Sequence, residues 1–293
     1  MQPVFRFAPS PNGFLHLGHA LSALLNADLA ARLGGRLLLR IEDIDPERCR
    51  PEYEKAIRED LAWLGLSFAE PVLRQSQEMA AYAARIDALR ERGLLYRCFC
   101  SRAGTARLVA AHEAAGTPWP RDPDGAPFHA GPCADLSERD SAVRAASGAP
   151  HSWRLRMAEA MAQLGEVPAI RCLDAQGRDA GERPARPRDW GDVVLARRDV
   201  PTSYHLAVVV DDARQGVTHV VRGADLARAT DVHRVLQTLL GLLSPAYHHH
   251  RLLTGEDGQK LAKSTRSTAL RDLRAQGWTP ADVRRAVGLG DAT

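Results

Sequence analysis

The start of the chain alternates between strand-like and helix-like segments, and this alternation constrains the fold more than any other feature. Apolar runs at 4–9 and 36–45 have the composition of buried strands. Each is followed by a segment with apolar residues at helical spacing, 17–34 and 51–66, the first of which ends in a glycine pair and the second of which begins with proline. Strand, helix, strand, helix in this order is typical of a parallel sheet with crossover helices. We therefore predict an α/β fold.

The rest of the chain contains further segments of both kinds. We predict helices at about 75–93, 224–243 and 269–289, and strands at 152–157, 192–198 and 217–223. The apolar run 204–212 is either a buried helix or a buried strand, because its pattern does not distinguish them. Residues 248–267 are predicted to form a polar, basic loop. Residues 101–150 are rich in Ala, Gly, Pro and Asp, which indicates an insertion that is part helix and part loop.

Composition limits the class of protein. Hydrophobic residues make up 45% and charged residues 26% of the chain, which is ordinary for a globular protein with a sizeable core. A net charge of +3 neither requires nor excludes a nucleic-acid partner. Five scattered cysteines argue against a disulfide framework, and no apolar run is long enough to cross a bilayer. We expect a cytoplasmic monomer that does not associate with membranes.

Two histidines bracket a glycine where the first predicted helix begins. Free amides at a helix start bind phosphate, and His16 and His19 can add donors while Gly18 lets a nucleotide approach the backbone. Alone, this HxGH pattern is weak, because a turn with two surface histidines explains it equally well.

A second motif strengthens the nucleotide interpretation. Residues 260–264 read KLAKS, and Lys260 and Lys263 beside a serine in a glycine-flanked loop suit a mobile clamp on a triphosphate. A solvated basic loop is the alternative. The presence of both motifs in this order favours the nucleotide site.

These motifs resemble those of a known family. The segment RFAPSPNGFLHLGHALSALLNADLAARLGGRLLLRIEDIDPER resembles the opening of glutamyl-tRNA synthetases with their class I HIGH-type signature, and KLAKS is similar to their KMSKS-type signature. The resemblance covers 4 to about 100 and about 190–266, and it implies a Rossmann-like class I synthetase catalytic domain. A full glutamyl-tRNA synthetase carries a large helical anticodon-binding region after this loop, whereas a short segment follows Ser264 here. The chain therefore resembles the truncated branch of the family, the glutamyl-queuosine tRNA(Asp) synthetases. The segments QSQ at 75–77 and VTHVVRGADL at 217–226 are also similar to those of this branch.

The resemblance implies an activity. Members of this branch activate L-glutamate with ATP without tRNA and transfer it to the queuosine base in the anticodon of tRNA(Asp), so ATP with Mg²⁺, L-glutamate and queuosine-bearing tRNA(Asp) are the expected partners. Three alternatives stay open: a truncated glutamyl-tRNA synthetase that charges a 3′ end, a non-catalytic paralogue, and another HxGH nucleotidyltransferase. The pairing of HLGH with KLAKS disfavours a pure binder. The chain is expected to comprise a first half of the catalytic domain (1–97), a zinc-binding insertion (98–150), a second half with the KLAKS loop (151–266) and a short helical tail without an anticodon-binding domain (267–293).

The resemblance also implies roles for residues around glutamate and ATP. Glutamate carries two carboxylates and one ammonium, so its site needs cations and an anion. Arg6 and Arg222 match the carboxylate-binding arginines, Glu42 matches the acid that holds the α-ammonium, Tyr204 matches the hydroxyl that closes the pocket, and Ala8 and Ser10 supply backbone and hydroxyl contacts. For catalysis, Lys263 is expected to contact the transition state, with Lys260 in support, and His16, Gly18 and His19 to hold the phosphates.

A cysteine-rich pattern indicates a structural zinc site. Cys98 and Cys100 in CFC, followed by His129 and Cys133 in FHAGPC, supply four ligands suited to tetrahedral Zn²⁺. The family pattern is C-x-C followed by Tyr-x-x-x-Cys, and His129 occupies the position of the tyrosine. His112 is a rival fourth ligand, because the intervening loop is long. Three unrelated cysteines are the simpler alternative.

Overall fold

Parallel strands form the centre of the protein. The structure, a computed structural model, describes residues 2–129, 131–253 and 268–290. Strand β1 (Val4–Phe7) pairs in parallel with β2 (Arg36–Ile41), which pairs in parallel with β3 (Ala69–Arg74). On its other side β1 meets β9 (His219–Gly223), where the Thr218 amide donates to the Val4 carbonyl at 3.0 Å.

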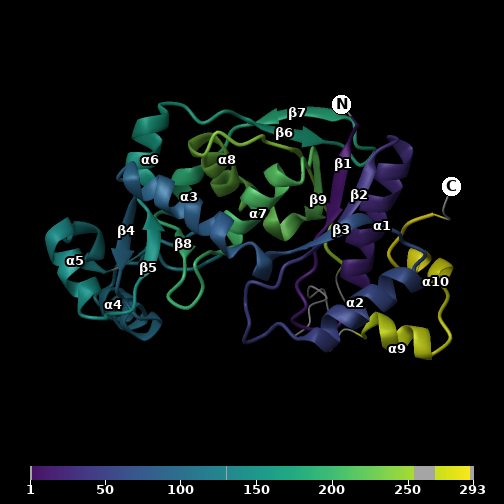
Figure 1. Cartoon of the computed structure of the whole chain (residues 1–293), viewed down its shortest axis with the longest axis horizontal. Helices are drawn as coiled ribbons and strands as arrows, with labels where there is room; N and C mark the ends of the chain where they lie inside the picture. The colour runs from purple at the N-terminus through teal and green to yellow at the C-terminus, as the bar shows by residue number, and fades with distance from the viewer. Residues whose placement is uncertain (1, 130, 254–267, 291–293) are drawn as a thin grey trace.

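Strand β9 is the edge of a second sheet of four strands (Figure 1). Strand β10 (Ala246–His250) is parallel to both β9 and β6 (Ile170–Leu173), and β7 (Asp179–Arg183) pairs antiparallel at the edge. The strands thus form two sheets, ordered β3-β2-β1 and β9-β10-β6-β7, which meet at β1 and β9, and the chain order reverses between these two strands. The predicted α/β fold with a parallel sheet is confirmed.

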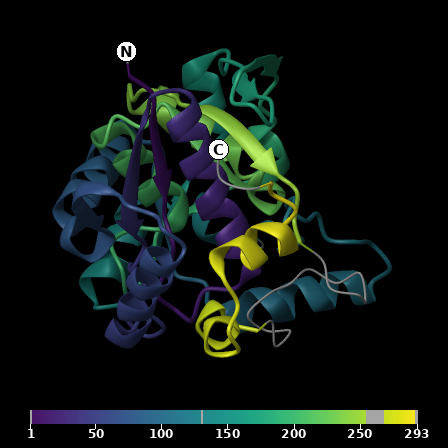
Figure 2. The same cartoon turned by 90° about the vertical axis from the view of Figure 1, so that its right-hand side faces the viewer.

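Helices cover the sheet and form two main cores. Their bounds are α1 Leu17–Arg32, α2 Pro51–Trp63, α3 Met79–Glu91, α6 Met157–Leu164, α7 Tyr204–Arg214, α8 Thr230–Leu239, α9 Leu270–Ala275 and α10 Pro280–Ala286. One core packs α3, α7 and α8 together, and the other packs α1 and α2 against α9 and α10. Helix α10 packs against α1 and α9 packs against α2, and Figure 2 shows these two helices in yellow in front of the purple α1 and the blue α2.

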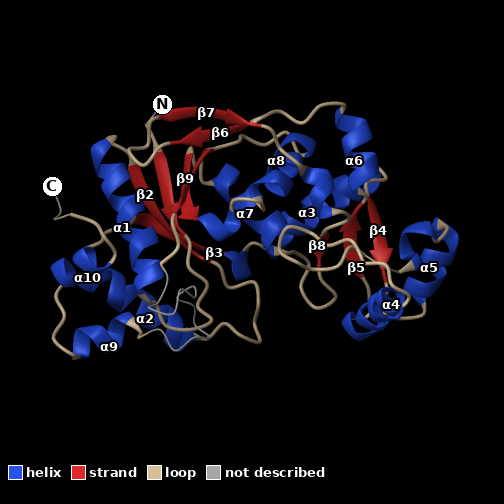
Figure 3. Ribbon diagram, turned by 180° about the vertical axis from the view of Figure 1, so that it is seen from behind, coloured by secondary structure: helices blue, strands red, loops and turns tan. Residues whose placement is uncertain are grey.

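The cysteine-rich segment belongs to a separate, antiparallel sheet. Strand β5 (Ser152–Leu155) pairs with β4 (Leu95–Cys98) and with β8 (Val194–Ala196), while α4 (Arg102–Ala114) and α5 (Glu138–Ala146) flank this sheet. Figure 3 shows this body at the opposite end of the molecule from α9 and α10.

Most predicted elements are present in the structure. The strands at the start of the chain, the helices that follow them and the helix α8 are confirmed, although a 3-10 turn at Gln75–Gln77 replaces the first turn expected for α3. The apolar run 204–212 is helical: α7 is buried between α3 and α8, and such a helix carries no apolar period.

One prediction is wrong. Residues 248–250, expected to begin a loop, complete strand β10 instead. Their polar composition indicates a loop, but parallel pairing with β9 satisfies their backbone groups, in the register His249 with Arg222. The side chains of His248 and His250 have different partners. Nδ1 of His248 lies 3.1 Å from the Leu173 carbonyl oxygen, and Nδ1 of His250 lies 2.9 Å from the Arg251 carbonyl oxygen.

None of the described helices is long and apolar enough to cross a membrane.

Candidate active site

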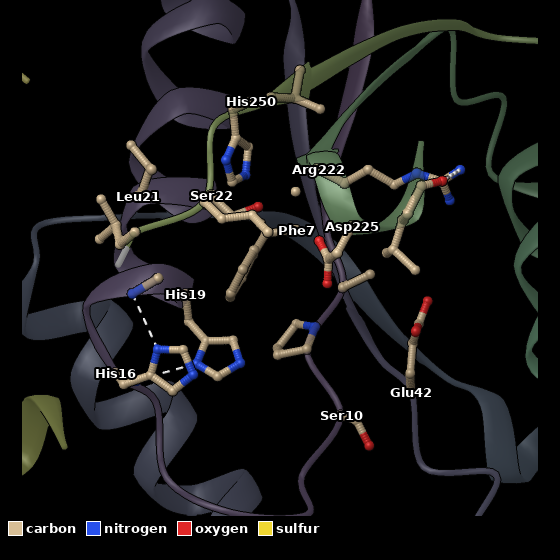
Figure 4. A pocket seen from close by; sticks show the side chains of 18 of the residues that line it. Phe7, Ser10, His16, His19, Leu21, Ser22, Glu42, Arg222, Asp225 and His250 are labelled. Carbon is tan, nitrogen blue, oxygen red and sulfur yellow. Dashed lines mark hydrogen bonds between the residues drawn. The ribbon is translucent and has the colours of Figure 1, made fainter. Parts of the chain in front are cut away.

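A cavity of about 710 Å³ opens where β1, β2, β9 and β10 end. In open α/β sheets, ligands bind beyond the carboxyl ends of the strands at the point where the strand order reverses, and this cavity occupies that position. Its walls include the following predicted residues: Arg6, Ala8, Ser10, His16, Gly18, His19, Glu42, Tyr204 and Arg222. Figure 4 shows His16 and His19 on one side of the cavity and Glu42 and Arg222 on the other.

Arg222 is buried at the end of β9 and is held by neutral groups. It donates from Nη1 to the Tyr204 hydroxyl at 3.1 Å and from Nη2 to the Thr230 hydroxyl at 2.8 Å. Among the described residues, no carboxylate oxygen lies within 4.0 Å of its guanidinium nitrogens. A buried cation without an anionic partner is unfavourable, so this arginine favours an anionic ligand in the cavity.

Arg6 has a different environment. Its Nε donates to Asp212 Oδ1 at 3.1 Å, and Arg40 Nη1 donates to the same oxygen at 2.7 Å. Arg40 also contacts Glu42 Oε1 from Nη2 at 3.1 Å, so Arg6, Asp212, Arg40 and Glu42 form one alternating chain of charges. Burial opposes ionisation of Asp212, but the two guanidinium groups outweigh it and lower the pKa of this carboxyl. The chain orients Glu42 at the cavity wall through Oε1, which leaves its second oxygen for a ligand cation.

Tyr204, Ala8 and Ser10 complete this side of the cavity. Tyr204 is the first residue of α7, and burial raises the pKa of its hydroxyl, which keeps it protonated and able to donate. Ser10 Oγ lies 3.7 Å from Cys49 Sγ.

His16 and His19 cap the helix that they begin. His16 Nδ1 accepts from the Gly18 amide at 3.1 Å, and His19 Nδ1 accepts from the His16 amide at 3.1 Å. Because each Nδ1 accepts a hydrogen bond, the proton of a neutral ring lies on Nε2. The Gly18 amide is therefore bonded within the cap, and Nε2–H is the donor group of each neutral imidazole.

Gly18 is required by this cap. A Cβ atom at this position would lie 2.9 Å from Cε1 of His16, closer than real Cβ contacts. The glycine therefore makes room for the capping ring, in addition to lining the cavity.

Lys260 and Lys263 lie outside the described residues. The described chain before them ends at Leu253, which lines the cavity. It resumes at Thr268, and Ala269 forms a β-bridge with His16. The described residues on either side of 254–267, Leu253 and Ala269, thus both lie beside the cavity.

The four predicted metal ligands lie together beside β4. The ligand atoms of Cys98, Cys100, His129 and Cys133 all lie within 4.8 Å of one another. Cys98 Sγ is 3.1 Å from His129 Nε2, and Cys100 Sγ is 3.4 Å from Cys133 Sγ. Sulfur atoms on a tetrahedral zinc ion with 2.3 Å bonds are about 3.8 Å apart, so the donor set and its spacing fit Zn²⁺.

The structure separates His129 from its rival. His112 is exposed on α4 and packs edge-on against Trp119, whereas His129 Nδ1 lies 3.3 Å from the Tyr96 hydroxyl, which orients its ring. Burial opposes ionisation of Cys98, but the hydrogen bond from His129 outweighs it and lowers the pKa of this thiol to about 6. A thiolate at Cys98 is the form that binds a metal.

Three histidines near Arg222 are neutral. Burial, with Arg222 adding to the effect, lowers the pKa of His249 to about 3 and of His205 to about 4, and holds that of His233 well below its usual range. The folded state therefore binds fewer protons than the unfolded state below pH 6.5.

This difference predicts a pH dependence of stability. Between pH 7 and 5, such a histidine gains its proton only on unfolding, so the free energy of unfolding falls as the pH is lowered, by about 2 kcal/mol for a group with the pKa of His205 or His249. We expect this fall in the free energy of unfolding, measured by urea unfolding at pH 7 and pH 5, to be smaller in His233→Asn than in the wild type. The exposed His112→Asn serves as the control and should keep the wild-type fall. Equal falls in wild type and His233→Asn would contradict the prediction.

Comparison with known proteins agrees with the geometry. Residues 4–290 match the family model of tRNA synthetases class I (E and Q), catalytic domain. A glutamyl-Q tRNA(Asp) synthetase from Rhodobacter capsulatus is 46% identical, over 98% of this chain and 100% of its own length. The chain belongs to the glutamyl-Q tRNA(Asp) synthetase family. A member from Nocardia farcinica is 43% identical over 95% of this chain and 81% of its own length.

A solved structure supports the fold assignment of this glutamyl-Q tRNA(Asp) synthetase family member. A glutamate tRNA ligase from Elizabethkingia meningosepticum, solved in complex with its amino acid, superposes with a TM-score of 0.73 at 26% identity. The match covers 95% of this chain and 54% of that one, so the chain spans about half the length of the solved relative.

Sequence reasoning missed several residues around the cavity. Arg40 and Asp212 join Arg6 to Glu42, and Asp225 lines the cavity against Gly223, where a Cβ would collide with the carboxylate. Two signals were available: an arginine inside the apolar run 37–41, and a pair of aspartates that follows the apolar part of α7. Both indicate buried charges that need partners.

Proposed function

We propose that this chain activates L-glutamate with ATP, without tRNA, and transfers it to queuosine in the anticodon of tRNA(Asp). The observation that carries the proposal is the cavity at the sheet switch point. On one side it has Glu42 and a buried Arg222 that pairs with no carboxylate of the described residues, and on the other side it has the HxGH imidazoles. An amino acid with two carboxylates and an ammonium complements the first side, and a polyphosphate complements the second.

The protein acts in the first step by positioning and by neutralising charge. An α-carboxylate oxygen of glutamate attacks the α-phosphorus of ATP, the bond to the β-phosphate breaks, and pyrophosphate leaves with the electron pair. His16 and His19 donate from Nε2 to phosphate oxygens, and Lys263 neutralises the charge that develops in the transition state, with Lys260 in support. Mg²⁺ accompanies the triphosphate and offsets its charge.

In the second step a hydroxyl group of queuosine attacks the acyl carbon of glutamyl-adenylate. The hydroxyl loses its proton, the new ester forms, and AMP leaves. Tyr204 and Arg222 continue to hold the glutamyl group during the transfer, because they bind its far end and not the reacting carbonyl.

The activation step is tested by ATP–pyrophosphate exchange without tRNA. We expect exchange that depends on glutamate and is at least about a hundredfold weaker with glutamine or aspartate at equal concentration, because glutamine lacks the second charge and aspartate is one methylene shorter. A requirement for tRNA, or exchange with glutamine in preference to glutamate, would refute this part of the proposal.

The cysteine–histidine cluster is proposed to hold a structural zinc ion. Zinc bound there supplies a crosslink between β4 and the segment around Cys133. The cluster lies at the end of the molecule away from α1, so its role is to order this body and not to touch ATP.

Metal analysis tests the zinc proposal. We expect about one zinc ion per chain in freshly purified protein. Cys133→Ser should lose the zinc and lower the melting temperature, because one of four ligands to a buried ion is removed. Cys172→Ser, on β6 outside the cluster, is the matched control and should keep both. Equal zinc content in the two variants would exclude the cluster as the site.

A further inference from the structure

Arg222 is surrounded on its buried side by hydrogen-bond acceptors that carry no charge. Its Nη2 contacts the Thr230 hydroxyl at 2.8 Å, the Leu226 carbonyl at 3.2 Å and His233 Nδ1 at 3.3 Å, and its Nε faces His249 Nε2 at 3.4 Å. We propose that His233, with Thr230 and His249, is a positioning residue that holds Arg222 through neutral acceptors so that its full positive charge is kept for a substrate carboxylate. This inference rests on the proposed function, because it assigns Arg222 to glutamate.

The directions of the hydrogen bonds fix the state of His233. Arginine only donates, so His233 Nδ1 must be the acceptor and the proton of the neutral ring must lie on Nε2. That Nε2 lies 3.3 Å from His205 Nδ1, which accepts in turn. His233 is 1% exposed, so no bulk water competes for these bonds. Geometry and burial therefore agree on a neutral imidazole that points its lone pair at Arg222.

Arg6 and Arg40 are also buried, but they are held by carboxylates and not by neutral groups. Arg6 and Arg40 share the carboxylate of Asp212, and Arg40 also pairs with Glu42. These pairs fix the side chains but neutralise much of their charge. Arg222 is fixed by neutral groups, so the ligand does not have to displace an internal carboxylate. An arginine in this state attracts a carboxylate more strongly than an amide, which is the difference between glutamate and glutamine.

The groups that face the histidines support their neutrality. His233 contacts Arg222 and His205, and the positive charges of Arg222 and of the more distant Arg6 disfavour a further positive charge on its ring. Asp231, on the same helix, is engaged by Arg183 at 2.6 Å. No carboxylate among the described groups within 4.0 Å stabilises a protonated His233.

A pair of isosteric variants separates charge from shape. Asparagine and aspartate have the same size, and both place an oxygen close to the position of His233 Nδ1, but only aspartate adds a negative charge beside Arg222. We expect His233→Asp to raise the KM for glutamate in ATP–pyrophosphate exchange by about thirtyfold, with kcat changed far less, because the new carboxylate competes with the substrate. His233→Asn should raise it by about threefold at most.

The preference for glutamate over glutamine supplies a second readout. In His233→Asp the ratio of kcat/KM values for the two amino acids should fall by about tenfold, whereas His233→Asn should keep the wild-type ratio. The KM for ATP should stay unchanged in both variants, and their melting temperatures show whether each is folded. Equal KM values and equal ratios in the two folded variants would overturn the inference. Absence of glutamate-dependent exchange in the wild type would instead refute the proposed function itself.

Discussion

Replacing Arg222 by glutamine is expected to raise the KM for glutamate by about a hundredfold or more. Loss of one partner of a buried, hydrogen-bonded charge pair costs about 3 kcal/mol or more, which corresponds to two orders of magnitude in affinity. Glutamine ends two bonds short of the Nη1 and Nη2 atoms that contact Tyr204 and Thr230, so the melting temperature of the variant shows whether it is folded. The measurement is ATP–pyrophosphate exchange as a function of glutamate concentration.

Two control variants test whether the effect is specific to the position and the side chain of Arg222. Arg188→Gln removes an exposed arginine that is not among the residues lining the cavity and should leave the KM for glutamate unchanged. Arg222→Lys keeps the charge but loses the fork of donors, so its KM should lie between those of the wild type and Arg222→Gln. A KM for glutamate that is the same in Arg222→Gln and Arg188→Gln would show that Arg222 does not bind the substrate carboxylate.

Lys263→Ala is expected to lower the rate of ATP–pyrophosphate exchange by about a thousandfold and to leave the melting temperature unchanged. The ammonium group is proposed to neutralise charge that appears only in the transition state, so its loss should reduce kcat more than it raises the KM for ATP. Both flanks of its segment lie at the cavity, at Leu253 and Ala269.

Lys55→Ala is the matched control, because Lys55 is an exposed lysine on α2 with a side chain that is 80% exposed. It should keep the wild-type exchange rate and melting temperature. Lys260→Ala should show a smaller loss than Lys263→Ala. An exchange rate in Lys263→Ala equal to that in Lys55→Ala would remove the proposed role of Lys263 in the transition state.

The sequence predicted the elements whose pattern is local. The glycine pair that ends α1, the proline at the start of α2 and the periodic spacing of both helices act within a few residues, and the structure confirms these elements. The joint presence of the two motifs around Gly18 and Lys263 favoured a nucleotide site, and their resemblance to a known family implied the substrates.

Elements set by distant partners were not predictable from the sequence. Residues 248–250 form a strand because β9 lies beside them, and His249 meets Arg222 only through the register of that pair. The partner of Arg40 is Asp212, which lies far along the chain, so the sequence could indicate a buried charge but not its neighbour. His233 lies on a helix whose pattern predicts burial, but neither its tautomer nor its contact with Arg222 follows from that pattern.

The site of glutamate attachment tests the central claim most directly. The protein is incubated with ATP, labelled glutamate and tRNA(Asp) that either carries or lacks queuosine, and the labelled tRNA is then treated with periodate or digested to locate the label. We predict that glutamate appears only on tRNA(Asp) with queuosine, at the anticodon nucleoside. Label on a 3′ terminal adenosine, or equal labelling of tRNA without queuosine, would contradict the account.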